Sequence, residues 1–217
     1  SIIQSTQKTS RYQKIIGNLH TMWSMRSLKV RNFTVEPVDR KVIQSFIHKW
    51  HYSRDTNGIQ QTQCFALYNE NKIIGAIIYA IPSMPATAAK YNPVNPDRCV
   101  ELRRLCCIDD TPKNTESYFI GQTLRWLRDN TEIKKVISYA DETYNHKGVI
   151  YKASNFKHLG MTKNGKVIVY KNKLYHDKTI RTKKPYAERI KTALDNGTAH
   201  YRDTLGKHIY MYELRRK

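Results

Sequence analysis

The sequence predicts an α/β protein with a mixed, mostly antiparallel central sheet flanked by helices. Segments with the alternating or continuous apolar pattern of β-strands recur along residues 33–214, and segments with helical periodicity lie between several of them. The strands cluster early and then alternate with helices, which is typical of one domain built on a mixed sheet. At 217 residues the chain is long enough for one good-sized core or two small ones.

The pattern begins with an alternating strand at residues 33–36. A helix is expected to follow, because Asp39 is a residue type that caps helix starts. Apolar residues recur after it at helical spacing and define the expected buried face: Val42, Ile43, Phe46, Ile47 and Trp50.

Two apolar runs at residues 64–68 and 73–79 predict a hairpin. The segment 82–96 contains four of the seven prolines, so we expect it to be an irregular, stiff loop. Residues 99–108 predict a further strand, with Glu101 and Arg103 on one of its sides.

The second half of the chain alternates helices and strands. A helix capped by Asn114 or Thr115 is expected to bury one face, made of Phe119, Ile120, Thr123, Leu124 and Leu127. A strand is expected next at 136–140, ending at Asp141. A helix is then expected from near His146 to a stop at Gly160, with an apolar face made of Val149, Ile150, Ala153 and Phe156. The remaining expected elements are a strand at 167–170, a helical segment between 185 and 194, and a last strand at 208–214.

The charge balance is strongly basic. The chain has 38 Lys and Arg against 18 Asp and Glu, a net charge of +20. Residues 157–217 alone hold 16 basic residues against 5 acidic ones. Such an excess indicates a polyanionic partner, most often nucleic acid, although solubility alone is the alternative interpretation.

The composition and the cysteine pattern also indicate the cellular compartment of the protein. No apolar run approaches the roughly 18 residues of a membrane span, and the first residues lack the core of a signal peptide. The four cysteines (Cys64, Cys99, Cys106 and Cys107) form no CxxC pair, so buried free thiols are expected and a zinc site is not. These features predict a cytoplasmic protein that does not associate with membranes.

Several polar residues stand where chemistry is often found, and each has a plainer interpretation. Asp141 follows a buried strand, where ligand sites of open α/β sheets lie, but it equally suits a helix cap. The helix start near Asn114 could hold an anion or simply be capped. His51 ends a helix, where it could titrate, bind metal or only interact with the helix dipole. Tyr151, inside an expected helix, could equally be a core residue.

Several blocks of the sequence together resemble the phage Mom family, a divergent branch of the GNAT acyltransferase superfamily. The longest block is residues 141–160 (DETYNHKGVIYKASNFKHLG). The others occur in the family's order: 51–53 (HYS), 101–105 (ELRRL), 112–117 (PKNTES) and 207–210 (KHIY). We therefore expect a basic extension at residues 1–32, followed by a GNAT-like catalytic domain at 33–217 with a basic insert at about 174–204.

The resemblance implies a phage-encoded, transferase-like enzyme in the host cytoplasm. Its expected reaction converts adenine in double-stranded DNA, at the exocyclic N6, into N6-methylcarbamoyl (acetamido) adenine, which protects phage DNA from host restriction. The implied cofactors are iron and an acyl donor, acetyl-CoA or another. The sequence leaves the oligomeric state open, with a dimer among the options.

The site residues follow from the same resemblance, position by position. The chemical core is expected to be His51, Tyr52, Asp141 and Tyr151. Iron ligands would come from His51, Asp141 and Tyr151, with His146 as a further candidate. The acyl donor would be held by Arg104, Lys113, Asn114 and Ser117, although the segment 109–117 lacks the glycines with which ordinary GNAT enzymes bind a pyrophosphate.

DNA contacts are expected from the most basic part of the chain. The expected backbone-binding residues are Lys183, Lys184, Arg189 and Arg215, and the tyrosines of that region (Tyr175, Tyr186 and Tyr201) could stack on bases or simply pack. Two other functions stay open from the sequence: an acyl-CoA-dependent N-acyltransferase acting on a small amine or a protein, and a non-catalytic DNA-binding protein.

Overall fold

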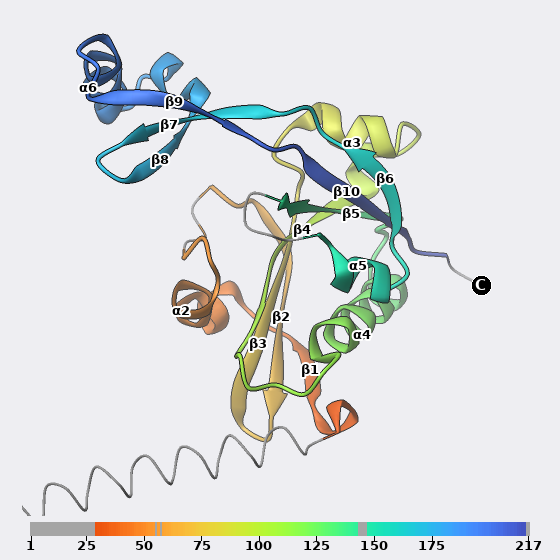
Figure 1. Cartoon of the computed structure of the whole chain (residues 1–217). Coiled ribbons are helices and arrows are strands. Elements are labelled where there is room, and N and C mark those ends of the chain that lie inside the picture. Colours follow the sequence, from red (N-terminus) through yellow and green to blue (C-terminus); the bar gives the residue numbers. More distant parts are fainter. Residues whose placement is uncertain (1–28, 55, 57, 143–146, 216–217) are drawn as a thin grey trace, which may run out of the picture. The chain divides into compact units, whose positions relative to one another are not determined.

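The computed structural model of the chain describes residues 29–54, 56, 58–142 and 147–215 (Figure 1). Most of the expected N-terminal extension, and His146, lie outside these residues. The chain divides into two compact units. The first unit contains the described residues up to Ser138 with Ile150–Phe156 and the residues from Met211 onward, and the second contains the described residues of Tyr139–Val149 and Lys157–Tyr210.

The first unit is built on a mixed sheet. Its strands, in spatial order, are β1 (Thr34–Pro37), β2 (Gln61–Asn69), β3 (Lys72–Ala80), β4 (Cys99–Cys107) and β5 (Lys135–Asp141), followed by the C-terminal residues of β10 (Lys207–Glu213). The pairs from β1 to β4 are antiparallel, and β4 pairs with β5 in parallel. This arrangement confirms the predicted α/β class with a mixed, mostly antiparallel sheet.

Helices cover both faces of this sheet, because the alternation along β2 and β3 gives each face its own apolar set. On one face, Ile43 and Ile47 of α2 (Arg40–Trp50) pack in a cluster with Ala76 and Ile78 of β3. On the other face lies α4 (Thr115–Asn130), whose Thr123 Oγ1 is 2.7 Å from the hydroxyl of Tyr79. Figure 1 shows α2 and α4 on opposite sides of β2 and β3.

The prediction for α2 was correct in position but too wide in its buried face. Ile43 and Ile47 are fully buried and Phe46 packs against the cluster, whereas Val42 and Trp50 are 44% and 36% exposed. A helix packed on a sheet buries only one stripe of its side chains, so apolar residues at the edge of that stripe stay in solvent. Asp39 occupies the N-cap position, but its side chain makes no capping hydrogen bond.

The prediction that residues 82–96 form an irregular loop was wrong. This segment contains helix α3 (Pro85–Tyr91) and leads into a short 3₁₀ helix, Pro96–Arg98. In both elements the proline occupies the first turn, where its missing N–H costs nothing and its fixed φ favours a helix. The alanines and lysine that follow Pro85 are good helix formers.

The helix predicted from near His146 to Gly160 is much shorter than expected. Helix α5 spans only Val149–Ala153, and Gly160 lies within strand β6 (Lys157–Met161). Asn155 adopts the left-handed conformation at φ +63°, which an asparagine tolerates and which ends the helix. Val149, expected on the buried face, is 70% exposed.

The second unit contains a smaller sheet with its own core. Strand β7 (Gly165–Tyr170) pairs antiparallel with β8 (Lys173–His176) and β9 (Ala199–Thr204). Helix α6 (Pro185–Asp195), which the sequence predicted at 185–194, follows a 3₁₀ helix at Asp177–Arg181. Their buried cluster consists of Ile168, Tyr170, Ile190, Ala193 and Ala199. In this unit the first residues of β10 lie beside β6.

All four cysteines are free thiols, as the sequence predicted. Cys64, Cys99 and Cys106 are buried, and Cys107 is half-buried. Among the described residues no helix combines the length and the apolar character that crossing a membrane requires.

Candidate functional site

His51 is fixed in place by the end of α2. Its backbone N–H donates to the carbonyl of Ile47 (2.9 Å), which closes the helix. Its imidazole is buried, and Nδ1 accepts the backbone N–H of Ser53 at 3.1 Å and lies 2.8 Å from the Ser53 hydroxyl. Because an N–H group already points at Nδ1, the neutral imidazole carries its proton on Nε2. The neutral His51 side chain can therefore donate a hydrogen bond from Nε2.

Tyr52 stands beside His51 and is largely exposed. The two ring centroids are 4.3 Å apart, and 56% of Tyr52 is accessible to solvent. The loop after them is held by Arg40, whose guanidinium donates to the carbonyls of Thr56 and Ile59, the latter at 3.0 Å. The Tyr52 ring is thus exposed to solvent next to the buried His51 imidazole, and this arrangement suits a stacking contact with a planar group.

Tyr151 lies within the first unit as a buried residue. It is 8% exposed, and its ring centroid is 5.5 Å from that of Phe156. It also lies close enough to Tyr79 to affect that residue's acidity. Burial is the main cause that raises the pKa of Tyr79; the Thr123 hydroxyl opposes this rise and Tyr151 adds to it. The Tyr79 hydroxyl is thus held against Thr123 of α4, and Tyr151 of α5 lies near enough to act on it electrostatically.

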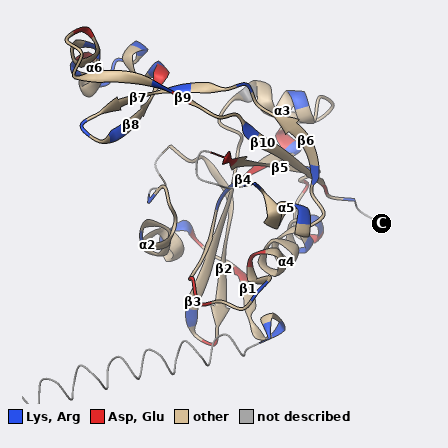
Figure 2. Ribbon diagram, viewed as in Figure 1, with Lys and Arg blue, Asp and Glu red and all other residues tan. Residues whose placement is uncertain are grey.

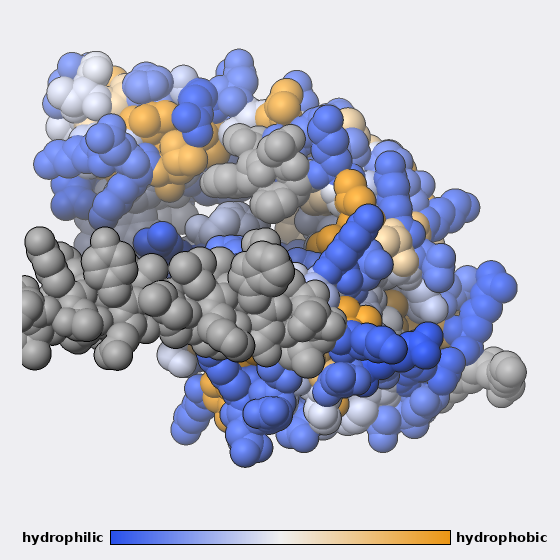
Figure 3. Space-filling view, turned by 60° about the horizontal axis from the view of Figure 1, so that its bottom comes forward, coloured by the Kyte–Doolittle hydropathy of each residue, from blue (hydrophilic) through white to orange (hydrophobic). Residues whose placement is uncertain are grey.

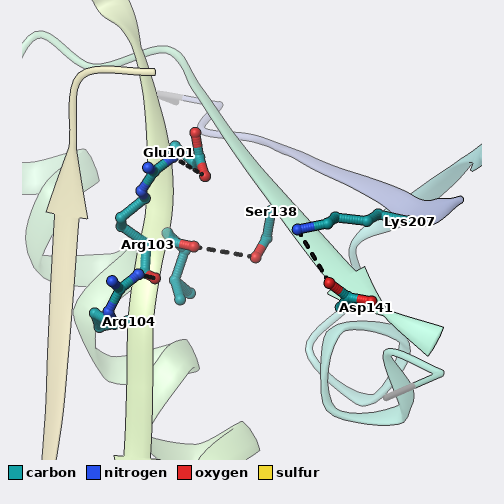
Figure 4. A network of polar contacts seen from close by, with 7 residues as sticks. Glu101, Arg103, Arg104, Ser138, Asp141 and Lys207 are labelled. Atoms are coloured by element: carbon teal, nitrogen blue, oxygen red, sulfur yellow. Dashed lines mark hydrogen bonds and ion pairs between the residues drawn. The ribbon is translucent and has the colours of Figure 1, made fainter. Parts of the chain in front are cut away.

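Asp141 belongs to the second unit, at the C-terminal end of β5. Its Oδ2 is 3.1 Å from the ammonium nitrogen of Lys207, the first residue of β10 (Figure 4). The Asp141 side chain is 14% exposed and that of Lys207 is 50% exposed. Of the predicted chemical core, Asp141 thus belongs to this unit, whereas His51, Tyr52 and Tyr151 belong to the first.

The described residues do not fit the iron centre that the family resemblance implied. Among them, no group of three or more His, Cys, Asp or Glu side chains has an arrangement able to hold a metal ion. Nδ1 of His51 is engaged by Ser53, and the carboxylate of Asp141 is paired with Lys207. His146 lies outside the described residues. We therefore derive no catalytic step through iron.

The predicted acyl-donor residues follow one another along β4 and into α4. Arg104 is half-buried in β4 and donates from Nη1 to the Arg103 carbonyl at 2.9 Å. Asn114 is the N-cap residue of α4 at φ +71°, with no side-chain cap. The Ser117 hydroxyl donates to the Asn114 carbonyl at 3.1 Å, and Lys113 is exposed. Lys113, Asn114 and Ser117 thus share the start of α4, where backbone N–H groups and the helix dipole favour an anion.

The parallel ladder between β4 and β5 is short. It pairs Cys99–Glu101 with Lys135–Ile137, although β4 continues to Cys107. Beyond the last pair, the Leu102 carbonyl accepts a hydrogen bond from the Ser138 hydroxyl at 3.2 Å, in place of the regular backbone pattern.

A buried carboxylate marks the point at which this ladder ends. Glu101 is 7% exposed and is compensated by Arg103, whose Nη1 is 2.9 Å away (Figure 4). A buried carboxylate requires such a partner. The predicted site omitted this pair. The alternation that placed both residues on one side of the strand was the available signal.

The predicted DNA-binding residues are exposed. Lys183 and Lys184 precede α6 and Arg189 lies on it, all in the second unit, where Figure 2 shows basic residues along β8, β9 and the α6 region. Arg215 belongs to the first unit and lies 3.5 Å from the carboxylate of Glu213. In the view of Figure 3, hydrophilic residues predominate on the described surface and hydrophobic ones appear in separate groups.

The three tyrosines of the basic region differ in their surroundings. Tyr175 and Tyr186 pack against the core cluster of the second unit, and the ammonium group of Lys184 lies 5.7 Å from the centre of the Tyr186 ring. Tyr201 is 48% exposed. Tyr201 is therefore the one of the three with a large accessible surface.

A match to a family model identifies the proteins to which this chain is related. The model of the Mom protein family matches residues 32–217, which is most of the chain. The chain belongs to the Mom protein family. One relative is the methylcarbamoylase mom of Escherichia phage Mu, which is 26% identical over 132 residues. That match covers 60% of this Mom family chain and 54% of the relative, so the chain spans about half of the relative's length.

Solved structures similar to this Mom family member are N-acetyltransferases. An N-acetyltransferase from Staphylococcus aureus is 12% identical, with 84% of this chain and 97% of that chain covered and a TM-score of 0.46. The polyamine N-acetyltransferase of Drosophila melanogaster is 10% identical, with 83% and 99% covered and a TM-score of 0.46. A GNAT family acetyltransferase from Elizabethkingia anophelis with acetyl-CoA bound is 10% identical, with 84% and 98% covered and a TM-score of 0.44. At these TM-scores we base no functional conclusion on the similarity.

Proposed function

We propose that this protein modifies DNA by converting adenine to N6-methylcarbamoyl (acetamido) adenine, and that the product protects phage DNA from host restriction. The observation that carries this proposal is membership of the Mom family over residues 32–217, with a phage Mu methylcarbamoylase among the relatives. The substrate would be double-stranded DNA in the cytoplasm of the host cell. The group donor would be acetyl-CoA or another acyl donor; because an acetyl group has no nitrogen, acetyl-CoA would need a second, nitrogen-containing co-reactant to supply the amide nitrogen of the product.

The charge of the chain supports a DNA substrate. A net charge of +20 attracts the phosphate backbone, and each neutralised phosphate releases condensed counterions. Lys183, Lys184 and Arg189 provide exposed positive groups in one short segment of the second unit. Arg215 would add a backbone contact from the first unit.

The chemistry requires the target base to leave the duplex stack. The exocyclic N6 of adenine is a poor nucleophile, because its lone pair is delocalised into the ring, and in a duplex it is enclosed by stacking and pairing. Tyr52, exposed beside His51, is placed to stack on such an extruded base. His51 would donate a hydrogen bond from Nε2 to a ring nitrogen.

The remaining predicted site residues have distinct proposed tasks. Asp141, oriented by Lys207, would hold the amine that reacts. Tyr151 would protonate the leaving group of the donor. Lys113, Asn114 and Ser117 at the start of α4, with Arg104 of β4, would hold the anionic part of the acyl donor.

Mass spectrometry of digested DNA tests the proposal. DNA from cells that express the chain should contain adenine nucleosides heavier by one acetamido group, and DNA from cells expressing Asp141→Ala should not. Absence of a modified nucleoside with the unaltered chain would contradict the proposed function. Acyl-CoA turnover without DNA would then indicate a small-amine or protein acyltransferase, and salt-dependent DNA binding without turnover would indicate a non-catalytic DNA-binding protein.

A further inference from the structure

Three tyrosine rings form a row in the second unit, and a lysine lies over each end of the row. The ring centroids of Tyr170 and Tyr175 are 6.5 Å apart, and those of Tyr175 and Tyr186 are 6.1 Å apart. The ammonium nitrogen of Lys171 lies 5.5 Å from the centre of the Tyr170 ring, and that of Lys184 lies 5.7 Å from the centre of the Tyr186 ring. The tyrosine row thus joins two cations that come from different segments of the chain.

The inner side of the tyrosine row is anchored in the core of the second unit. Tyr170 is 9% exposed and belongs to the buried cluster, and Tyr175 and Tyr186 pack against that cluster as half-buried residues. Lys171 and Lys184 are exposed. An ammonium group within about 6 Å of a ring centroid is attracted by the negative face of the ring. The anchored rings therefore hold both lysine side chains at defined places on the surface.

Lys171 stands in a tight turn that does not favour a lysine. Strands β7 and β8 are paired up to Tyr170 and Lys173, so Lys171 and Asn172 alone make the turn between them. Both turn residues have a positive φ, +47° and +59°. A two-residue turn of this kind favours glycine and asparagine, which adopt a positive φ more easily than a lysine does. The cation at the tip of the hairpin thus occupies its place against the local backbone preference.

Lys184 is held by the first turn of α6. It is the N-cap residue, and its carbonyl accepts the backbone N–H of Ala187 at 2.9 Å. Pro185 follows it at the start of the helix, where the ring of a proline fixes the backbone in a helical conformation. Both lysines therefore extend from an ordered backbone, one from a hairpin turn and the other from a helix start.

The chain around the tyrosine row is strongly basic. Residues 163–191 contain ten Lys and Arg against two Asp and Glu. One of these acidic residues, Asp177, has its carboxylate 2.5 Å from Nδ1 of His176, and the other, Glu188, lies on α6. Figure 2 shows basic residues at the β7–β8 turn and in the α6 region. The partner that complements this surface is a polyanion, and the phosphate backbone of nucleic acid has this character.

We propose that Lys171 and Lys184 bind the phosphate backbone of the DNA substrate at the two ends of the tyrosine row, and that the row positions them. This proposal rests on the proposed function, which supplies DNA as the substrate. A lysine loses rotamer freedom when it binds a phosphate, and a side chain that a ring already holds loses less of it. Lys171 was not among the residues predicted from the sequence, so it is an additional DNA-binding residue.

The first test measures the positions of the two lysines without DNA. In proton NMR spectra of the full chain, their ε-methylene resonances, assigned with Lys171→Gln and Lys184→Gln, should lie upfield of those of other lysines, because the face of an aromatic ring shields protons above it. Tyr186→Leu should remove the shift of Lys184 and leave that of Lys171. Ordinary shifts for both lysines in the unaltered chain would overturn the positioning role of the tyrosine row.

The second test measures the phosphate contact of Lys171 by fluorescence anisotropy with a labelled duplex. For Lys171→Gln the slope of log affinity against log salt should decrease by about 0.9, so the affinity lost between about 50 and 200 mM salt should be about 3.5-fold smaller. Lys171→Arg retains the charge and should keep the slope.

Lys166→Gln is the matched control for Lys171→Gln. It removes the same charge from a lysine of the same strand region, 3.9 Å from the carboxylate of Asp203, and should change the slope much less. A slope for Lys171→Gln equal to that of the unaltered chain would overturn the proposal.

The third test separates positioning from packing. Tyr186→Phe keeps the ring face beside Lys184, whereas Tyr186→Leu keeps an apolar side chain and removes that face. Affinity for the duplex at fixed salt should be unchanged for Tyr186→Phe and about two- to fivefold weaker for Tyr186→Leu, with unchanged circular dichroism spectra for both. Equal affinities of the two variants would overturn the role of this ring in DNA binding.

None of these measurements depends on catalysis, so the two proposals can fail separately. Modified adenine in cellular DNA together with an unchanged slope for Lys171→Gln overturns the role of Lys171 and leaves the proposed function standing. A reduced slope for Lys171→Gln with no modified adenine overturns the proposed function, and the two lysines then belong to a non-catalytic DNA-binding surface.

Discussion

The ammonium group of Lys207 lies 3.1 Å from the carboxylate of Asp141, which joins the start of β10 to the end of β5. The aspartate is mostly shielded and the lysine half-exposed, so the pair is partly screened by water. Its main consequence is geometric, because it holds the carboxylate in one orientation at a strand end where ligands of α/β sheets bind.

Removing the carboxylate should therefore abolish the proposed reaction without abolishing DNA binding. Asp141→Asn is expected to lower modified adenine in cellular DNA by about a hundredfold, because the reacting amine is no longer positioned, whereas Lys207→Gln should lower it less, because the carboxylate remains. The matched control is Asp203→Asn, which removes the acidic partner of an exposed ion pair with Lys166 at 3.9 Å. Equal activity of Asp141→Asn and the unaltered chain would exclude Asp141 from the chemistry.

Neutralising two lysines before α6 should weaken DNA binding in a salt-dependent way. For Lys183→Gln with Lys184→Gln, the slope of log affinity against log salt should decrease by about 1.8, since each lost phosphate contact removes about 0.9. Fluorescence anisotropy with a labelled duplex at several salt concentrations measures this slope. Lys41→Gln with Lys72→Gln removes the same charge from exposed sites of the first unit and should change the slope much less. Equal slopes for the two double variants would show that binding depends on net charge alone.

The buried cysteines should make the protein sensitive to alkali. Burial raises the pKa of the Cys106 thiol from 9.0 to about 12. Above pH 9 the unfolded chain therefore loses this proton while the folded chain keeps it, so the unfolded state binds fewer protons. The free energy of unfolding must then fall as pH rises from 9 to 12, by up to about 1.4 kcal/mol per pH unit for one such thiol.

Urea unfolding at pH 8, 9 and 10 tests this expectation. Between pH 9 and pH 10 the unaltered chain should lose about 1 kcal/mol more stability than Cys106→Ala, whose residue cannot ionise. Cys64 and Cys99, whose pKa values burial raises to about 11, contribute equally to both curves. Parallel curves for the two proteins would show that Cys106 ionises with the same pKa in both states.

Gly148 should tolerate no side chain, for two separable reasons. It has φ +70°, and a Cβ would come within 2.2 Å of the Tyr210 ring. Gly197 has the same backbone requirement, at φ +76°, but open space around it. Gly148→Ala should therefore destabilise the protein by more than Gly197→Ala, which should cost about 1 kcal/mol.

Chemical denaturation of the two glycine variants gives this difference directly. The additional loss of stability for Gly148→Ala, relative to Gly197→Ala, measures the steric contact with Tyr210. Tyr210→Ala combined with Gly148→Ala should remove this additional loss. Similar losses for both glycine variants would mean that the ring moves aside without cost.

Local patterns predicted most of the first unit. The hairpin of β2 and β3, the buried face of α4 and strand β5 were all predicted, because each depends on a strong periodicity within one segment. The errors arose where one residue decides the outcome. Pro85 begins a helix within a segment expected to be irregular, and Asn155 ends α5 after five residues. Strands β8 and β9 are short and polar on one side, so they gave little apolar signal.

The sequence by itself determined the basic character of this protein, its α/β class and the residues that resemble the Mom family, because composition, periodicity and motif order are properties of the chain alone. The tertiary structure decided which side chains meet. It paired Asp141 with Lys207, and it brought His158 within 3.1 Å of His208, 50 residues along the chain. The physical reason is that the proton positions and charges of polar groups depend on partners within hydrogen-bonding distance, and only folding brings residues so distant in sequence to that distance.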